Sequence, residues 1–271
     1  MIEVKNPKIA VPVVLFAGIL WSFGALIVRY MQDPHLVPWQ YIFSRGLTIF
    51  IILNLYLYFD EGKEFYKNYF KIGLSGVVGG SGLGIAMICF IYSITMTTAA
   101  VTLLCLAAMP FFTALLAFLF LRETISINVW ISIIIATVGL AIIAIDNTEK
   151  ASLLGLIFGI TSSIGFSVYS VTLRWRKETP KFTTVAFAGF FCVVFATIMI
   201  LSNGLVFFSS SYNSAMFSLH GTVVCLGLIL YSIGSKAIPA AELTLLSLTE
   251  VIGGIFWVWL PLFGINEIPT T

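Results

Sequence analysis

The chain contains one apolar pattern twice, about 140 residues apart. The segments Tyr92–Ile94, Ala99–Ala100 and Thr102–Leu106 recur, with small changes, as Tyr231–Ile233, Ala240–Ala241 and Thr244–Leu248. Further upstream, Gly18, Ser22 and Gly24 match Gly159, Ser163 and Gly165 at a uniform offset of 141 residues. Self-similarity over half a chain constrains the fold strongly, because two copies of one pattern are expected to form two related units.

The composition is that of a membrane protein. Hydrophobic residues make up 59% of the chain and charged residues only 10%, whereas soluble domains carry about 25% charged residues. The apolar residues form runs of roughly 20, long enough to cross a bilayer as helices. The first run, Ile9–Val28, is too long for a signal-peptide core, so we interpret it as a membrane helix rather than a leader. The sequence therefore predicts an all-α integral membrane protein.

Nine membrane-spanning helices are predicted. They are Ile9–Tyr30, Val37–Phe59, Ile72–Ile94, Ala99–Leu121, Val129–Ile145, Leu153–Leu173, Val185–Ser202, Phe217–Ile233 and Ala237–Leu262. Five spans form a first repeat, 9–145, and four belong to a second repeat, 153–271. Because five is odd, the second repeat enters the membrane from the opposite side, which predicts an inverted repeat. We expect a ten-helix (5+5) bundle with its tenth helix missing here, the alternative being a true nine-helix design.

Lysine and arginine gather in alternate loops. If the N-terminus is cytoplasmic, eleven of the 14 basic residues lie on the cytoplasmic side: Lys5, Lys8, Lys63, Lys67, Lys71, Arg122, Arg174, Arg176, Lys177, Lys181 and Lys236. The opposite side holds only Arg29 and Lys150, and Arg45 lies within a span. Since cytoplasmic loops are enriched in basic residues, the sequence predicts a cytoplasmic N-terminus.

Short motifs follow one another along the chain. The first repeat contains Ala17–Trp21, Phe43–Gly46 and Pro110 followed by Leu115–Leu116 and Arg122–Glu123, and the second contains Ala240–Leu246 leading to Thr249–Val251. In these motifs the chain resembles the EamA type of the drug/metabolite transporter superfamily. It departs from that pattern in the missing last helix, in Ile252 where the other repeat has Pro110, and in Gly264–Glu267, where the family usually reads Gly-Glu.

The resemblance implies ten helices around a central cavity, in a multi-pass protein of the bacterial inner membrane. Members of the family move small organic metabolites such as amino acids, sugars, nucleotide precursors or cationic drugs, and export is common among them. The substrate itself does not carry over to this chain.

Glu250 is a carboxylate near the middle of the ninth span. An ionisable group at the centre of a membrane helix costs roughly 2.5–3.5 kcal/mol on insertion scales, so it is expected to face a cavity or a partner. Ser247 and Gly254 continue the same stripe of the helix. Glu250 can bind an ammonium group or carry a coupling proton. Alternatively it is a structural carboxylate, satisfied by neighbouring hydroxyl groups or by Arg45.

Two further charged residues are candidates. Arg45 lies about two turns into the second span, where it can bind a carboxylate or phosphate with its two-pronged guanidinium. It can instead extend outward to the interface or neutralise a glutamate in the bundle. Glu242, near the cytoplasmic mouth of the ninth span, either contributes to the site or only complements the helix dipole.

Small residues form stripes on two spans. Ser22 follows Gly18 in the first span, and Ser163 follows Gly159 in the sixth. Such stripes allow helices to pack closely, and they can also give a cavity polar walls without charge. The third span carries a GxxxGxxxG motif from Gly76 to Gly84, which predicts a helix contact and not a nucleotide-binding loop.

Trp21, Tyr92 and Tyr231 are the aromatic candidates. They can stack on a substrate or its cationic centre, or they can simply pack in the core. His35 and His220 both fall near the outer face, far apart in sequence, and no group of residues has metal-ligand spacing. We therefore expect no metal and no cofactor.

These patterns favour a secondary transporter over an enzyme. The expected partners are a small-molecule substrate, the lipid bilayer and protons as the coupling ion, and no nucleic acid. An ATP-binding motif is absent, so transport would use an ion gradient, exchange or downhill flow. The alternatives are an integral membrane enzyme, which would need acidic residues or histidines clustered at one interface, and a non-transporting membrane protein. The sequence does not identify the substrate, the direction, the coupling ion or the oligomeric state.

Overall fold

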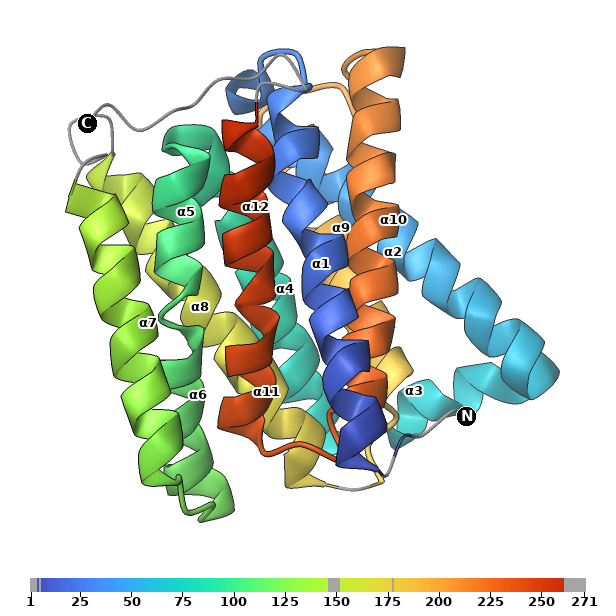
Figure 1. Cartoon of the computed structure of the whole chain (residues 1–271). Helices are drawn as coiled ribbons and strands as arrows, with labels where there is room; N and C mark the ends of the chain where they lie inside the picture. Colours follow the sequence, from blue (N-terminus) through green and yellow to red (C-terminus); the bar gives the residue numbers. More distant parts are fainter. Residues whose placement is uncertain (1–3, 5, 146–151, 177, 261–271) are drawn as a thin grey trace.

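The computed structural model describes residues 4, 6–145, 152–176 and 178–260. Throughout this part of the chain the regular structure is helical and contains no strand (Figure 1). Eight of its helices are long and apolar enough to cross a membrane. The predicted all-α membrane fold is confirmed. Lys5, Lys150, Lys177, Gly264–Glu267 and the end of the ninth predicted span lie outside the described residues.

The first half of the chain consists of α1 (Pro7–Arg29), η1 (Pro34–Leu36), α2 (Pro38–Glu61), η2 (Gly62–Tyr66), α3 (Lys67–Lys71), α4 (Gly73–Met96), α5 (Ala99–Leu106), α6 (Met109–Leu116), the π-helical turn η3 (Ala117–Leu121) and α7 (Ile127–Ile145). The second half consists of α8 (Leu153–Trp175), α9 (Lys181–Ser202), α10 (Ser211–Gly234), α11 (Ala240–Ser247) and α12 (Thr249–Trp259). Within the described residues, every predicted span therefore corresponds to one helix or to two or three consecutive helical elements.

Helix starts follow local capping chemistry. The Thr98 hydroxyl accepts a hydrogen bond from Val101 N at the start of α5, and the Ser210 hydroxyl accepts one from Asn213 N at the start of α10. Side-chain oxygens at this position satisfy amide groups that have no partner within the helix. Because Ser210 caps α10, this helix begins six residues before the predicted span at Phe217.

The fourth and ninth predicted spans are each interrupted by a short break in the helix. The fourth is divided at Ala107–Ala108 and the ninth at Leu248, within two residues of the same position in the repeat. Pro110 explains the first break, since proline has no amide hydrogen to continue a helix and is well placed in the first turn of α6. A run of apolar residues hides such a break, because hydropathy reports length and not backbone continuity.

Serine side chains of α8 support the first break. Ser163 Oγ donates a hydrogen bond to the carbonyl oxygen of Cys105, and Ser167 Oγ donates one to that of Met109 at 3.0 Å. Backbone groups released by a break at membrane depth need such partners. The break therefore depends on close packing of α8 against α5 and α6.

The packing partners come in matched pairs. The contact of α1 with α10 corresponds to the contact of α8 with α4. In the same way, the contacts of α1 with α11 and α12 correspond to the contacts of α8 with α5 and α6. Likewise α2 packs on α10 as α9 packs on α4. In Figure 1 α1 runs upward from its first residue, whereas α8 runs downward. Two halves related by a two-fold axis in the membrane plane would produce this pattern.

Glycines allow the closest helix approaches. The stripe from Gly76 to Gly84 faces α9, where a Cβ on Gly80 would lie 2.6 Å from the Phe187 ring. On another face of α4, a Cβ on Gly165 of α8 would lie 2.5 Å from the carbonyl oxygen of Gly82. The predicted helix contact of the GxxxGxxxG motif is therefore confirmed, and its partner is α9.

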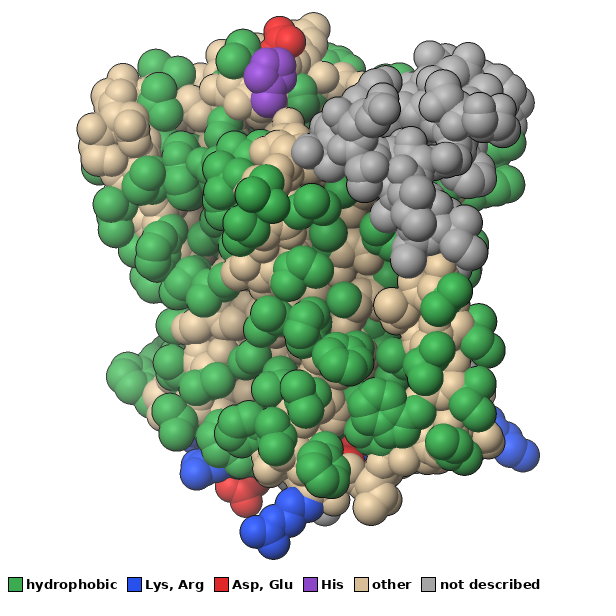
Figure 2. Space-filling model, turned by 90° about the vertical axis from the view of Figure 1, so that its left-hand side faces the viewer, with side chains coloured by type: hydrophobic (Ala, Val, Ile, Leu, Met, Phe, Trp, Pro, Cys, Tyr) green, Lys and Arg blue, Asp and Glu red, His purple; other side chains and the backbone are tan. Residues whose placement is uncertain are grey.

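The outer surface is largely apolar. Figure 2 shows hydrophobic side chains over most of the face formed by α5–α8, with lysine and arginine at the lower edge, the end at which α1 begins. Large side chains such as Phe118, Leu119 and Phe120 are 60–64% exposed. In water such a surface would be costly, whereas a bilayer accommodates it.

Candidate functional site

A cavity of about 60 Å³ lies between the two halves of the chain, which is room for a few water molecules. Helices α1, α2, α4, α5, α6, α8, α10 and α12 all contribute to its wall. Its polar lining residues are Arg45, Ser162, His220 and Glu250, and most of the remaining wall is apolar. Residues beside both helix breaks line the cavity, so both interruptions of the helical backbone lie next to it.

Glu250 lies in the first turn of α12, two residues after the break at Leu248. Within the described residues its carboxylate forms no hydrogen bond and no ion pair, and it faces the cavity. The positive end of the α12 dipole favours a negative charge at this position. The alternative that neighbouring hydroxyl groups satisfy the carboxylate is not supported, because the hydroxyl of Ser247 donates to Thr244 O at 2.7 Å instead.

Arg45 faces the same cavity from α2 and is 5% exposed, so it does not extend to the interface. One terminal nitrogen lies 3.5 Å from Met87 O, and the guanidinium carbon lies 5.5 Å from the centre of the Phe90 ring. Its Nε is buried without a hydrogen-bond partner. Arg45 and Glu250 interact electrostatically without a direct ion pair. A buried donor without a partner is costly and is commonly satisfied by a ligand or by water.

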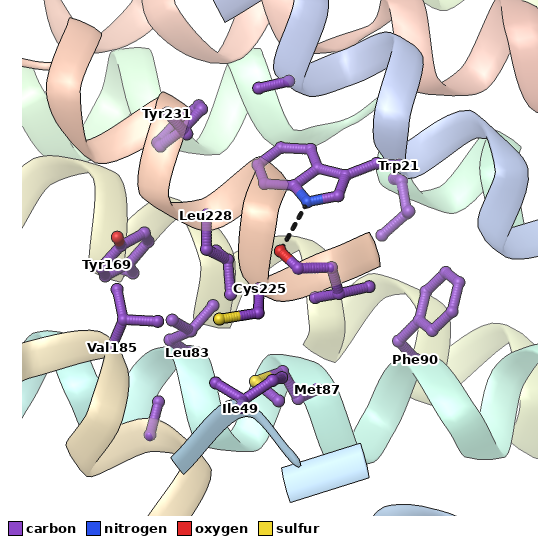
Figure 3. Close-up of a cluster of buried hydrophobic side chains, with 14 of the residues drawn as sticks. Trp21, Ile49, Leu83, Met87, Phe90, Tyr169, Val185, Cys225, Leu228 and Tyr231 are labelled. Carbon is purple, nitrogen blue, oxygen red and sulfur yellow. Dashed lines mark hydrogen bonds between the residues drawn. The ribbon is translucent and has the colours of Figure 1, made fainter. Parts of the chain in front are cut away.

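Trp21 lines the cavity from α1. Its indole Nε1 donates to Val224 O on α10 at 3.1 Å, the bond drawn in Figure 3. The ring packs edge-on against Phe166, with ring centres 5.6 Å apart, and lies tilted against Tyr231, with ring centres 5.5 Å apart. The indole donor is therefore already used, so Trp21 offers a ligand mainly an aromatic surface.

Comparison with known families supports what this geometry indicates. The EamA-like transporter family matches residues 8–145, half of the chain. The chain belongs to this family. Apolar helices long enough to cross a bilayer are in keeping with that membership.

Relatives of this EamA-family chain are also called transporters. It is 26% identical over 257 residues to an "uncharacterized transporter" of Helicobacter pylori strain J99, covering 91% of this chain and 84% of that protein. It is 28% identical over 171 residues to another from strain 26695, covering 62% of this chain and 56% of that protein. A solved structure, "Crystal structure of protein", has the same fold, with a TM-score of 0.72 and 18% sequence identity. The match covers 96% of this chain and 90% of that chain.

The other aromatic candidates do not line the cavity of this EamA-family protein. Tyr231 lies behind Trp21, fully buried, and its hydroxyl bonds to Ser170 Oγ at 2.7 Å. Tyr92 packs against Trp39 and Phe158, away from the lining. The contacts of both tyrosines agree with the core-packing alternative, and their stacking on a substrate stays a prediction.

The hydroxyl groups of the three candidate serines all take part in hydrogen bonds within the bundle. Ser22 donates to Ile19 O at 2.6 Å and accepts from Trp257 Nε1 at 2.9 Å, while Ser163 and Ser247 are fully buried and bonded to backbone carbonyls. None of the three lines the cavity, whereas Ser162, one residue before Ser163, does. Close helix packing explains their stripes better than polar cavity walls.

Glu242 is placed in the first turn of α11 and does not line the cavity. Its position agrees with the alternative in which it only complements the dipole of that helix. The amide group of Ala240 at the start of α11 is bonded by a different acid, Glu123, at 3.3 Å.

His220 is a lining residue that the sequence placed near the outer face. It is 1% exposed on α10, and its Nδ1 is hydrogen-bonded to the Tyr41 hydroxyl of α2. The spacing of His220, Val224 and Leu228 puts all three on one face of α10, a signal that could have identified it. Among the described residues, no group of three His, Cys, Asp or Glu side chains could hold a metal ion.

Proposed function

We propose that this protein is a secondary transporter of the bacterial inner membrane, with a cytoplasmic N-terminus, that moves a small organic solute by alternating access. The observation that carries this proposal is the cavity containing Arg45 and Glu250, which form no ion pair with each other. Two opposite charges held apart in an apolar wall can both be used by a ligand.

The proposed mechanism uses two inverted halves, 9–145 and 153–271. The matched helix contacts and the two breaks at equivalent positions support this division. In such an arrangement one half rocks against the other around a fixed site, so the cavity faces each side of the membrane in turn.

The proposed solute is an amino acid, an amine or a related compound. Glu250 would bind an ammonium group, Arg45 would bind a carboxylate with paired hydrogen bonds, and Trp21 with Phe166 would contact the apolar part. A solute with both charges fits this wall best, because each buried charge then receives a counter-charge. Glu250 is also the proposed carrier of a coupling proton, and export is the proposed direction.

A two-stage experiment tests this proposal. Purified protein is first screened by thermal shift against amino acids, amines and uncharged metabolites, since a bound solute raises stability by mass action. A compound that raises the midpoint is then loaded, radiolabelled, into sealed liposomes containing the protein. Movement of the compound across the bilayer supports transport. Binding without movement, or chemical conversion of the compound, would instead support a non-transporting protein or an enzyme.

A further inference from the structure

An ion pair with several hydrogen bonds joins the ends of η3 and α8 to the start of α11, at the end of the bundle where α1 begins (Figure 1). Arg174, in the last turn of α8, pairs with Glu123 through Nε and Oε1 at 2.7 Å. A terminal nitrogen of Arg174 also donates to Ile238 O at 2.7 Å and to Ser235 O at 3.2 Å, in the turn between α10 and α11.

Glu123 completes the network from the other half of the chain. It follows Arg122, whose left-handed backbone (φ 54°) ends η3. The second carboxylate oxygen of Glu123 accepts a hydrogen bond from Ala240 N, at the start of α11. One ion pair therefore joins the end of η3 to α8, to the α10–α11 turn and to α11, which leads to Glu250.

Buried tyrosines separate this network from the cavity. Tyr169 and Tyr231 lie further along α8 and α10 than the cavity residues Phe166 and Leu228, in the direction of the network. Both are 0% exposed. Two fully buried aromatic side chains therefore lie between the cavity and this end.

The two halves also meet at the opposite end. There the chain after α1 meets the start of α10 through neutral hydrogen bonds, from Gln32 N to Asn213 Oδ1 at 3.0 Å and from Tyr212 Oη to Tyr30 O at 3.0 Å. Hydrogen bonds between charged groups are about twice as strong as neutral ones. The Glu123–Arg174 pair is therefore a strong contact at the end where α1 begins.

We propose that the Glu123–Arg174 ion pair is a latch that keeps the cavity closed toward the end where α1 begins, and that it must separate before solute reaches that side. This inference rests on the alternating access proposed above. The pair joins the two halves that would move apart, and its side chains are 25% and 23% exposed, so water can solvate both charges once they separate.

Side-specific labelling tests the latch without any solute. Ser162→Cys introduces a thiol into the cavity wall at little change in size, and the parent protein, whose Cys89, Cys105, Cys192 and Cys225 are buried, gives the background. A membrane-impermeant maleimide is applied to vesicles of either orientation, with an N-terminal tag reporting which side is exposed. Glu123→Gln is the test variant. Glu64→Gln, which breaks the exposed Glu64–Lys67 pair within one segment, is the matched control.

Glu123→Gln is expected to speed labelling from the α1-start side by roughly fivefold, while the control leaves it unchanged. An unchanged rate in folded Glu123→Gln would overturn the proposal. If Glu123→Gln does not fold, Arg174→Lys is tested in its place. This variant keeps the positive charge but loses the guanidinium hydrogen bonds to Ser235 O and Ile238 O. It must raise the labelling rate, and an unchanged rate would overturn the proposal. If Glu123→Gln speeds labelling but the protein is shown to transport no solute, the proposed function is rejected and the role of the ion pair is still supported.

Discussion

The Tyr41 hydroxyl of α2 is hydrogen-bonded to Nδ1 of His220 on α10, in the wall that also contains Arg45. On the other side of the imidazole, a Cβ added to Gly24 of α1 would lie 2.7 Å from Nε2. The histidine is therefore positioned by three helices, and the glycine in α1 is needed to admit the ring. This contact joins the two halves beside the proposed binding site.

Replacing the Tyr41 hydroxyl tests that junction. Tyr41→Phe leaves a buried ring nitrogen without its partner, which is expected to cost about 1–3 kcal/mol of stability and to lower the thermal unfolding midpoint. Tyr92→Phe is the control, because the described contacts of Tyr92 are between rings. Equal midpoints for the two variants would show that the Tyr41–His220 bond contributes nothing measurable.

Arg45 is expected to distinguish carboxylate solutes from those without a carboxylate. Arg45→Gln should weaken binding of an amino acid by about tenfold or more, because a buried charge-assisted pair is lost, and should not weaken binding of the amine that lacks the carboxylate. Arg45→Lys should recover part of the affinity, since it keeps the charge but not the fork. Calorimetric titration of both solutes measures the difference.

Arg176→Gln supplies the control for Arg45, because it removes a positive charge from the exposed end beyond α8. It should leave both affinities at the parent value. A parallel loss of amino acid and amine binding in Arg45→Gln would contradict the assigned role and indicate a general disturbance of the cavity.

The sequence was sufficient to predict the membrane fold and the two charged residues of the cavity. Long apolar runs leave helices as the main option in a bilayer, and a charge within such a run is expensive enough to need a cavity. Arg45 and Glu250 were identifiable for that reason. The hydrogen bonds of Ser163 and Ser247 were not predictable, since a serine at helical spacing can bond to a carbonyl or face a cavity equally well.

His220 and the helix breaks show what hydropathy cannot reveal. The polar residues Ser211–Ser214 hide the first turn of α10, so His220 seemed close to the helix end although it lies more than two turns inside. No proline near Leu248 predicts the break at that residue. It is stabilised by tertiary contacts, such as the 3.4 Å bond from Thr249 Oγ1 to Leu15 O on α1, that depend on the folded bundle.

The contact between α4 and α8 predicts the effect of a single methyl group. Alanine is normally preferred to glycine inside a helix by about 1 kcal/mol, but a Cβ on Gly165 would lie 2.5 Å from Gly82 O, a backbone atom that cannot rotate away. Overpacking of this kind costs about 1–3 kcal/mol, so Gly165→Ala is expected to lower the unfolding midpoint. Ile164→Ala, at a neighbouring residue that is 41% exposed, should change it less. A higher midpoint for Gly165→Ala would mean that helix propensity outweighs the contact.

Glu250 is expected to couple solute movement to protons. Glu250→Gln keeps the size and the hydrogen-bonding ability of the side chain but cannot release a proton, so liposomes containing it should lose accumulation driven by a pH gradient and retain downhill exchange. Glu242→Gln is the matched control, because it makes the same change on α11, away from the cavity lining. The two variants should therefore differ only in the response to the gradient.

Normal proton-driven accumulation by Glu250→Gln would exclude Glu250 as the proton carrier. Loss of both accumulation and exchange would instead assign the carboxylate to binding of the solute's ammonium group, since exchange requires binding but no proton transfer.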